Sequence, residues 1–184
     1  FTSVLEVSNC EDEILTKAQI VSDAVNRARQ LIHTPSNIKN PEWIAKQAKK
    51  YANGTKVEVK SGVQLNEFGG LKAVGGSSPK PGPRFIKMSY APRKSGAKHI
   101  VLVGKGITYD TGGISLKRPY DIMIPMKSDM AGAAACLAVM SALKDLKANV
   151  KVTALLMCAE NAISGTAQRP GDVITHYGGK TVER

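Results

Sequence analysis

Two short apolar runs with a helix-like segment between them constrain the fold of this chain most. The runs KHIVLVG (98–104) and VKVTALLMCAE (150–160) are continuous, as expected for strands of a sheet that is buried on both faces. Residues 129–147 between them are rich in alanine and predict a helix. The order strand, loop, helix, strand predicts a right-handed crossover between parallel strands of an α/β sheet.

The rest of the chain adds further helices and strands to this unit. Apolar side chains at helical spacing predict a helix over 11–32. Asn40 and Pro41 predict the cap and first turn of a second helix, which ends near Gly54. Shorter elements are predicted as a strand at 55–60, a short helix at 61–70, and strands at 71–76 and 84–90.

The strong positive charge raises the question of a nucleic-acid partner. The formal net charge is +11, from 26 lysines and arginines against 15 acids. The basic residues are spread along the chain, with the densest groups at 46–50 and 92–98, and no aromatic residues interleave with them as a base-stacking surface requires. We therefore expect a solvated basic surface and no nucleic acid, with a nucleic-acid-binding module as an alternative that salt-sensitive binding would support.

The apolar and cysteine patterns predict a cytoplasmic protein that does not enter the membrane. The longest apolar stretch, at 130–140, is shorter than the roughly 20 residues of a membrane-spanning helix, and the first residues do not resemble a secretory signal. Cys10, Cys136 and Cys158 have no paired spacing, and the last two lie in apolar segments. We expect these two to be buried thiols in a reducing compartment.

Charged residues gather after the first apolar run. Lys105 lies at its carboxyl end, Asp110 and Lys117 follow closely, and Asp129 opens the next helix. In open α/β sheets, ligands bind at the carboxyl ends of the strands. The two aspartates can supply oxygen ligands to a hard divalent cation, whereas a lysine can join only with a neutral amine. A metal site is therefore one interpretation.

The stretch VGKGITYDTGGISLK (103–117) does not fit a phosphate-binding loop. A dinucleotide fingerprint needs the pattern G-x-G-x-x-G, and here the third glycine comes late, at Gly112. A P-loop needs Ser or Thr after its lysine, whereas Lys105 is followed by Gly106. A tight turn at Gly112 and Gly113 with surface lysines stays open as the structural alternative.

Beyond these patterns, the chain resembles the leucyl aminopeptidase family, the cytosolic dinuclear metallo-aminopeptidases also called M17. The resemblance is carried by VGKGITYDTGGISLK (103–117) and MKSDMAGAAA (126–135). It extends, in order, to residues 28–48, 68–90 and 158–183. It implies an α/β fold with a mixed β-sheet flanked by helices, as an incomplete portion of the aminopeptidase catalytic domain.

The resemblance also implies roles for single residues. Lys105 and Asp129 would ligate one metal ion, and Asp110 would bridge both ions. Lys117 would be catalytic and substrate-binding, because it would polarise the scissile carbonyl and stabilise the oxyanion. Met126 would line the pocket for the first side chain of the substrate. The cofactors implied are two divalent metal ions, Zn and/or Mn, with Mg or Co possible.

At the level of the whole protein, the resemblance implies a homo-hexameric aminopeptidase that releases leucine-like residues from peptide substrates. Residues 1–33 would be a linker helix, and residues 34–184 the N-terminal portion of the metallopeptidase catalytic domain. The family signature Asn-Thr-Asp-Ala-Glu-Gly-Arg, which supplies further metal ligands, would come after this stretch, so we expect only part of the site here and an inactive fragment. Lys117 and Asp129 are one residue further apart than the family implies, which leaves a catalytically inactive structural or binding relative as the alternative.

Overall fold

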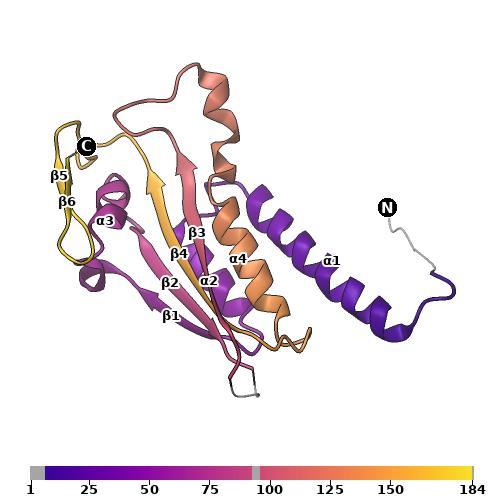
Figure 1. Ribbon diagram of the computed structural model, residues 1–184. Coiled ribbons are helices and arrows are strands. Elements are labelled where there is room, and N and C mark those ends of the chain that lie inside the picture. The colour runs from indigo at the N-terminus through magenta and orange to yellow at the C-terminus, as the bar shows by residue number, and fades with distance from the viewer. Residues whose placement is uncertain (1–6, 93–95, 184) are drawn as a thin grey trace.

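Four strands form one mixed sheet in the computed structural model, which describes residues 7–92 and 96–183 (Figure 1). Their order across the sheet is β1-β2-β4-β3. β2 pairs antiparallel with both β1 and β4, whereas β3 and β4 are parallel neighbours. The predicted mixed sheet is therefore confirmed. The strands are β1 (Lys56–Lys60), β2 (Arg84–Tyr90), β3 (His99–Asp110) and β4 (Lys151–Asn161).

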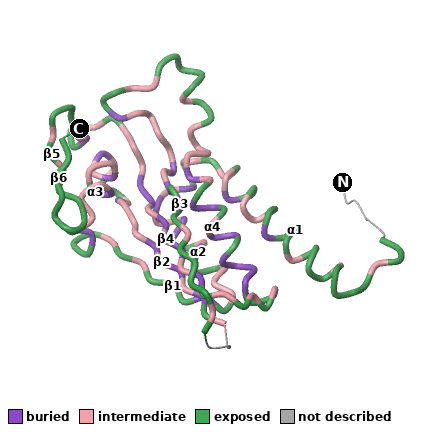
Figure 2. The backbone as a smooth tube through the Cα atoms, in the orientation of Figure 1, coloured by how far each residue is buried: buried purple, intermediate pink, exposed green. Residues whose placement is uncertain are grey.

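Helices cover both faces of this sheet. The main core lies between the sheet and two helices, α2 (Pro41–Lys50) and α4 (Ala131–Ala142). A smaller core lies on the opposite face, under α3 (Gly69–Gly75) and the 3-10 turn η1 (Gly62–Leu65). Because side chains alternate along a strand, β4 sends Leu156 to the first core and Met157 to the second. Figure 2 shows the buried residues concentrated along this sheet and α4.

The long first helix, α1 (Asp12–His33), packs against α4 rather than against the sheet. Small side chains make this contact, with Ala24 of α1 buried against Ala138 and Ala142 of α4. The Arg27 side chain donates a hydrogen bond to Ser141 in the same interface. The helix predicted at 11–32 is confirmed, and residues 1–6 of the expected linker lie outside the described residues.

The strand at 98–104 differs from its prediction in two ways. Val101 is 52% exposed and Val103 66%, so the strand is not buried on both faces. The physical reason is its position: among the described residues β3 forms the edge of the sheet, and α3, the helix on the face opposite α4, packs mainly on β4. The strand also continues to Asp110, with an irregularity after Ile107, so residues predicted as loop are strand.

Other boundaries needed correction as well. Residues 71–76 were predicted as a strand, but most of them belong to α3, because Leu71 and Val74 lie one helical turn apart and both pack on the sheet. The helix predicted at 129–147 is shorter, since α4 spans Ala131–Ala142, and α2 ends at Lys50.

The capping and thiol predictions had mixed outcomes. The Asn40 side chain accepts a hydrogen bond from the Trp43 backbone at 2.9 Å and so caps α2, as predicted. Cys158 is buried as predicted, but Cys136 is only half-buried. The residues 93–95 of the basic group at 92–98 lie outside the described part of the chain. The sequence pattern missed a short hairpin of β5 (Val173–Thr175) and β6 (Thr181–Glu183).

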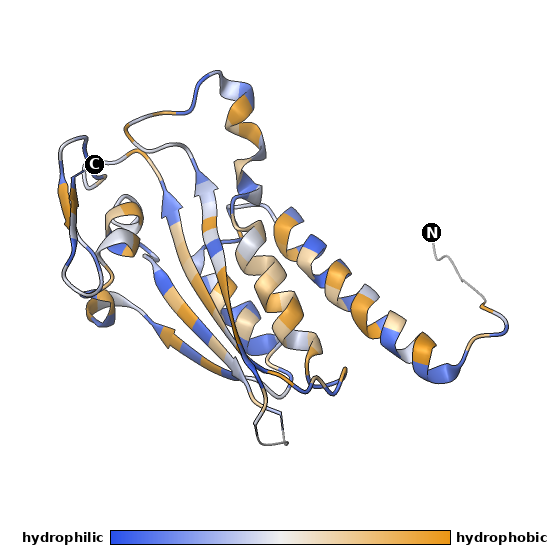
Figure 3. Cartoon of the chain, viewed as in Figure 1, coloured by the Kyte–Doolittle hydropathy of each residue, from blue (hydrophilic) through white to orange (hydrophobic). Residues whose placement is uncertain are grey.

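One helical stretch is long and apolar enough to cross a membrane by length and composition alone. It spans Tyr120–Ala142 and joins α4 to the 3-10 turns η2 (Tyr120–Ile122) and η3 (Ile124–Ser128). In the fold, the α4 half of this stretch is a core helix, with Leu137 and Met140 fully buried against the sheet. Figure 3 shows the apolar colouring of α4 beside the sheet. This core position accounts for its apolar composition.

Two glycines allow α4 to lie directly on β3. A Cβ atom on Gly104 of β3 would lie 2.7 Å from the Ala133 Cα atom of α4. A Cβ atom on Gly132 of α4 would lie 3.2 Å from the backbone nitrogen of Lys105. The backbones therefore approach more closely at this crossing than any larger residue allows, and the start of α4 is held beside the middle of β3.

We predict that Gly104→Ala lowers the free energy of unfolding by about 1–3 kcal/mol, because the added methyl group pushes α4 away from β3. Gly165→Ala is the matched control, since a Cβ atom there meets nothing within 4 Å. Urea unfolding measures both variants. Equal stability of the two variants would show that the crossing is not tightly packed.

Candidate functional site

The four charged residues singled out in the sequence form two ion pairs beside β3, the edge strand of the sheet. Lys105 Nζ lies 2.8 Å from Asp129 Oδ2, and Lys117 Nζ lies 3.2 Å from Asp110 Oδ2. β3 supplies Lys105 and Asp110, the loop after β3 supplies Lys117, and the residues just before α4 supply Asp129. The close crossing of α4 over β3 thus brings together residues up to 24 positions apart in the chain.

Asp110 is held by several donors in addition to Lys117. Its Oδ1 atom accepts hydrogen bonds from Asn161 Nδ2 at 2.7 Å and from the Gly112 backbone at 2.9 Å. Burial, the largest single effect, raises the pKa of Asp110, but these two hydrogen bonds and the Lys117 ammonium together outweigh it. The pKa of Asp110 therefore lies below its usual value, and the group is a carboxylate at neutral pH.

The Asn161 contact was missed by reasoning from the sequence. Asn161 ends β4, which runs parallel to β3, and its backbone pairs with Asp110. The Asn161 carbonyl also accepts hydrogen bonds from the Thr111 backbone at 3.0 Å and from Thr111 Oγ1 at 2.9 Å. The sequence places Asn161 at the carboxyl end of the neighbouring parallel strand. This position could have indicated the contact, because the carboxyl ends of parallel strands lie at the same end of a sheet.

Asp129 has a carboxylate oxygen that accepts no hydrogen bond from the described residues. The side chain is 19% exposed, and its Oδ2 atom is buried. The Lys105 amine lies beside this oxygen but outside hydrogen-bonding geometry. A carboxylate oxygen that is held by an ion pair alone can exchange the amine for a bound cation, so Asp110 and Asp129 suit a hard divalent ion.

The donor set is nevertheless small. Among the described residues, no three His, Cys, Asp or Glu side chains gather closely enough to hold a metal ion. Two carboxylates alone leave most coordination positions of a divalent cation to water, amines or other groups. The described residues therefore account for part of a metal site.

A cavity of about 490 Å³ opens beside these residues. Lys105, Asp110 and Asn161 form its polar side. The opposite walls are largely apolar and come from both α3 and the sheet, with Leu71, Val74, Val103, Ile107 and Met157. An apolar cavity with a few converging polar groups is the usual form of a small-molecule site.

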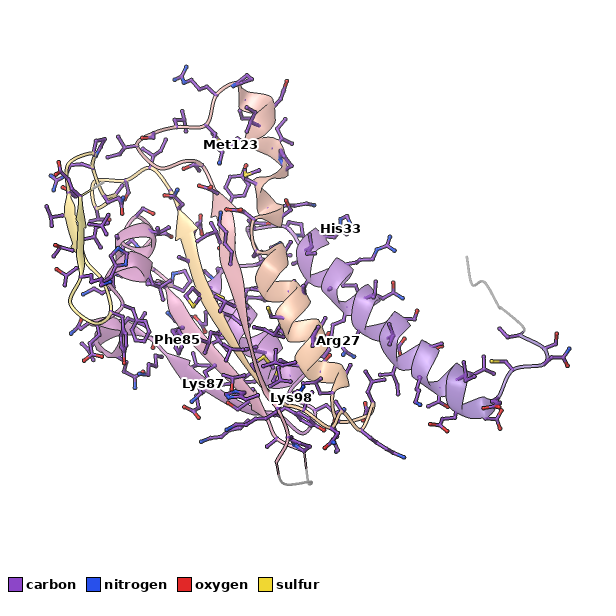
Figure 4. All side chains as sticks on the ribbon, viewed as in Figure 1. Arg27, His33, Phe85, Lys87, Lys98 and Met123 are labelled. Atoms are coloured by element: carbon purple, nitrogen blue, oxygen red, sulfur yellow. The ribbon has the colours of Figure 1, made fainter. Side chains whose placement is uncertain are left out.

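Met126, predicted to line a substrate pocket, is not among the residues that line this cavity. It lies in η3, half-buried, three residues before Asp129. η3 belongs to the segment that extends beyond the carboxyl ends of the strands, near the labelled Met123 in Figure 4. The structure thus joins the four charged residues in pairs, and Met126 contacts Asp129 through its backbone carbonyl, which accepts a hydrogen bond from the Asp129 backbone at 3.2 Å.

Comparison with known proteins assigns a family to this arrangement. Residues 26–184 match the model of the cytosol aminopeptidase family, catalytic domain, Peptidase_M17. A probable cytosol aminopeptidase from Micrococcus luteus is 48% identical over 176 residues, which is 94% of this chain and 34% of that protein. The corresponding protein from Streptomyces avermitilis is 49% identical, over 91% of this chain and 33% of its own length.

Solved structures show the same similarity in three dimensions. The bottromycin maturation enzyme BotP in complex with Mn has a TM-score of 0.89 and 36% identity, and the match covers 96% of this chain and 39% of that one. Leucyl aminopeptidase from Trypanosoma cruzi has a TM-score of 0.87 and 37% identity, over 91% and 33% of the two chains. This chain spans about a third of the length of the curated relatives it matches.

We predict that Asn161→Leu destabilises the metal-free protein at pH 7 by about 1–3 kcal/mol, because Asp110 loses a charge-assisted hydrogen bond. The lowered pKa of Asp110 means that its stabilisation is present above the unfolded pKa of about 3.9 and is lost as the pH falls through the folded pKa. The destabilisation should therefore shrink on acidification below the folded pKa.

Urea unfolding at pH 7 and at acidic pH measures this difference. Asn66→Leu is the control, because Asn66 Oδ1 accepts its hydrogen bond from exposed Lys72 and touches no carboxylate. An Asn161→Leu effect of equal size at both pH values would mean that the Asp110 carboxylate is not the group that Asn161 stabilises.

Proposed function

The chain belongs to the cytosol aminopeptidase family, M17, and from this premise we propose that it carries part of the active site of a metal-dependent aminopeptidase. The proposed reaction is hydrolysis of the first peptide bond, with release of leucine-like N-terminal residues. The observation that carries the proposal is the paired set Lys105–Asp129 and Lys117–Asp110 beside an apolar cavity. Activity of the whole protein is part of the proposal, because the chain spans about a third of its relatives.

Asp110, Asp129 and Lys105 are the proposed metal ligands. The Asp129 Oδ2 atom, which accepts no hydrogen bond from the described residues and lies 2.8 Å from the Lys105 amine, supports this role, and one similar enzyme is described in complex with Mn. Two divalent ions, Zn and/or Mn with Mg or Co as alternatives, would activate a water molecule and polarise the peptide carbonyl when bound. Lys105 would need a neutral amine to join them, and the neighbouring Asp129 would then be free to face the cation.

Lys117 is the proposed catalytic residue. Its ammonium group lies 3.2 Å from Asp110 Oδ2, and its side chain is only 27% exposed, so the amine is held close to the proposed ligand without being one. A fixed positive charge at this place would bind the substrate carbonyl oxygen and stabilise the negative charge that develops on it. Two hydrogen bonds keep Asp110 in place while Lys117 makes such a contact.

The substrate preference follows from the apolar walls of the cavity. Leu71, Val74 and Met157 offer the kind of surface that binds a leucine-like side chain. Met126 is proposed as a further wall of the substrate pocket, supported by its position in the same short segment as Asp129. Residues 34–184 are the proposed N-terminal portion of the catalytic domain, after a linker helix within residues 1–33.

The proposed assembly and location rest on the family. Relatives named cytosol aminopeptidases support a cytoplasmic location, and a homo-hexamer is proposed for the whole protein. The alternative, a catalytically inactive structural or binding relative, is favoured by one observation. Two lysines and two aspartates already balance their charges in pairs, which is a stable arrangement without any metal.

We predict different defects for two variants of the complete gene product. Asp129→Asn should weaken Mn²⁺ binding, because the buried carboxylate charge is lost. Lys117→Gln should leave Mn²⁺ affinity nearly unchanged and lower kcat by about 10²–10³-fold, the usual effect of removing one oxyanion-stabilising group. Calorimetric titration with Mn²⁺ and hydrolysis of leucine p-nitroanilide measure the two effects.

Lys180→Gln is the control variant, because Lys180 is exposed and lies in the loop between β5 and β6. Chelation of metal should abolish hydrolysis, and added Mn²⁺ or Zn²⁺ should restore it. Wild-type protein that binds no divalent ion and hydrolyses no N-terminal residue would favour the inactive relative instead.

A further inference from the structure

Lys39 is a fully buried lysine that the proposed mechanism does not use. It lies in the loop between α1 and α2 and is 0% exposed. No carboxylate of the described residues lies within 4.0 Å of its amine, so it has no ion-pair partner there. Its Nζ atom instead donates to two backbone carbonyls, that of Ile32 at 2.8 Å and that of Lys127 at 2.7 Å. A buried cation without a counter-charge is rare and calls for a specific role.

The contact with the Ile32 carbonyl stabilises the buried charge of Lys39. Ile32 belongs to the last turn of α1, where backbone carbonyls lack partners within the helix and the helix dipole is negative. A cation at this end is stabilised by both effects. Burial, and secondly the nearby charge of Lys127, lower the pKa of Lys39 to about 8, so the group is still mostly charged at neutral pH.

The second contact reaches the segment that carries the proposed site residues. The Lys127 carbonyl belongs to η3, one residue after Met126 and two residues before Asp129. The Lys127 side chain returns toward α1, where its Nζ atom donates to the His33 carbonyl at 3.1 Å. Lys39 and Lys127 therefore each hold one carbonyl from the end of α1, and together they join this end to η3.

A few side-chain hydrogen bonds join the segment around η2 and η3 to the rest of the described chain. The segment projects beyond the carboxyl ends of β3 and β4 (Figure 1). Its residues Tyr120, Ile122 and Ile124 are exposed. At its middle, Tyr109 Oη donates to the Met123 carbonyl at 3.1 Å. At η3, its end nearest α4, the segment approaches the end of α1, where Figure 4 labels His33. Lys39 and Lys127 join η3 to α1, and of these two side chains Lys39 is the fully buried one.

We propose that Lys39 is a positioning residue, whose ammonium group fixes the Lys127 carbonyl and thereby sets the places of Met126 and Asp129 in the site. The inference rests on the proposed function, since it concerns the substrate selectivity and metal affinity of that same site. A lysine suits this role because one ammonium group can donate to two carbonyls at once. An apolar residue of similar length would leave both carbonyls buried without a donor.

The test compares Lys39→Met with two matched lysine variants in the complete gene product. Hydrogen exchange, followed by mass spectrometry, should become about 10-fold faster at residues 123–130 in Lys39→Met, because a charge-assisted anchor is lost. Mn²⁺ affinity should fall about 10-fold, as when an outer partner of a ligand is removed. The kcat/KM ratio between leucine and alanine p-nitroanilides should also fall, whereas a purely structural lysine would not change this ratio.

The two matched variants remove lysines of different kinds. Lys127→Met removes only the half-exposed anchor and should give a smaller effect of the same type. Lys46→Met removes an exposed lysine that pairs with Glu42 on the surface of α2 and should change none of the measurements. Lys39→Gln keeps two N–H donors on a shorter side chain and should restore part of the loss. It also replaces Lys39→Met in the test if the latter does not fold.

The outcomes separate failure of this inference from failure of the proposed function. Faster exchange confined to residues 123–130, with weaker Mn²⁺ binding and lower selectivity, supports the positioning role. Unchanged exchange there, equally faster exchange throughout the protein, or a loosened segment with unchanged Mn²⁺ affinity and selectivity would overturn it. Wild-type protein without Mn²⁺ binding or hydrolysis would refute the proposed function, and with it the coupling of Lys39 to a site.

Discussion

The direct contact between α4 and β3 is the constraint on which the site depends. Gly104 and Gly132 carry no side chains at the crossing, and either Cβ atom would meet the backbone of the facing element. Because the crossing is tight, the residue after Gly104 and the residues before α4 lie side by side. Lys105 and Asp129 form their pair as a result, although the chain between them passes through a long projecting segment.

The electrostatics of the site follow from this geometry. Each lysine has one aspartate within reach, so the charges balance locally and the partly buried carboxylates are tolerated without a metal. Asp110 is fully engaged by donors, whereas Asp129 keeps one buried oxygen without a hydrogen bond. The two carboxylates are thus held differently: Asp110 by an ion pair and two hydrogen bonds, and Asp129 by its ion pair with Lys105. Lys39 acts at a greater distance, through the backbone of η3, on the same side of the site as Asp129.

The sequence patterns predicted the elements well where local chemistry decides them. The first helix, the Asn40 cap and the parallel pair around the alanine-rich helix were all confirmed. The errors came where packing decides. Residues 71–76 were predicted as a strand, but most of them are helical, because Leu71 and Val74 then pack on the sheet face together. The apolar run at 98–104 is half exposed because strand order placed β3 at the edge of the sheet.

By itself, the sequence determined the family and the identity of the charged residues, because these are properties of residue type and spacing. It also determined the adjacent parallel strands, since a helix between two apolar runs has few other ways to pack. Only the tertiary structure decided which lysine faces which aspartate, because that depends on how far α4 approaches β3. The roles of Asn161 and Lys39 were decided there as well. Their partners lie 51 and 88 residues away along the chain, and the folded backbone alone brings those donors and acceptors within 3 Å.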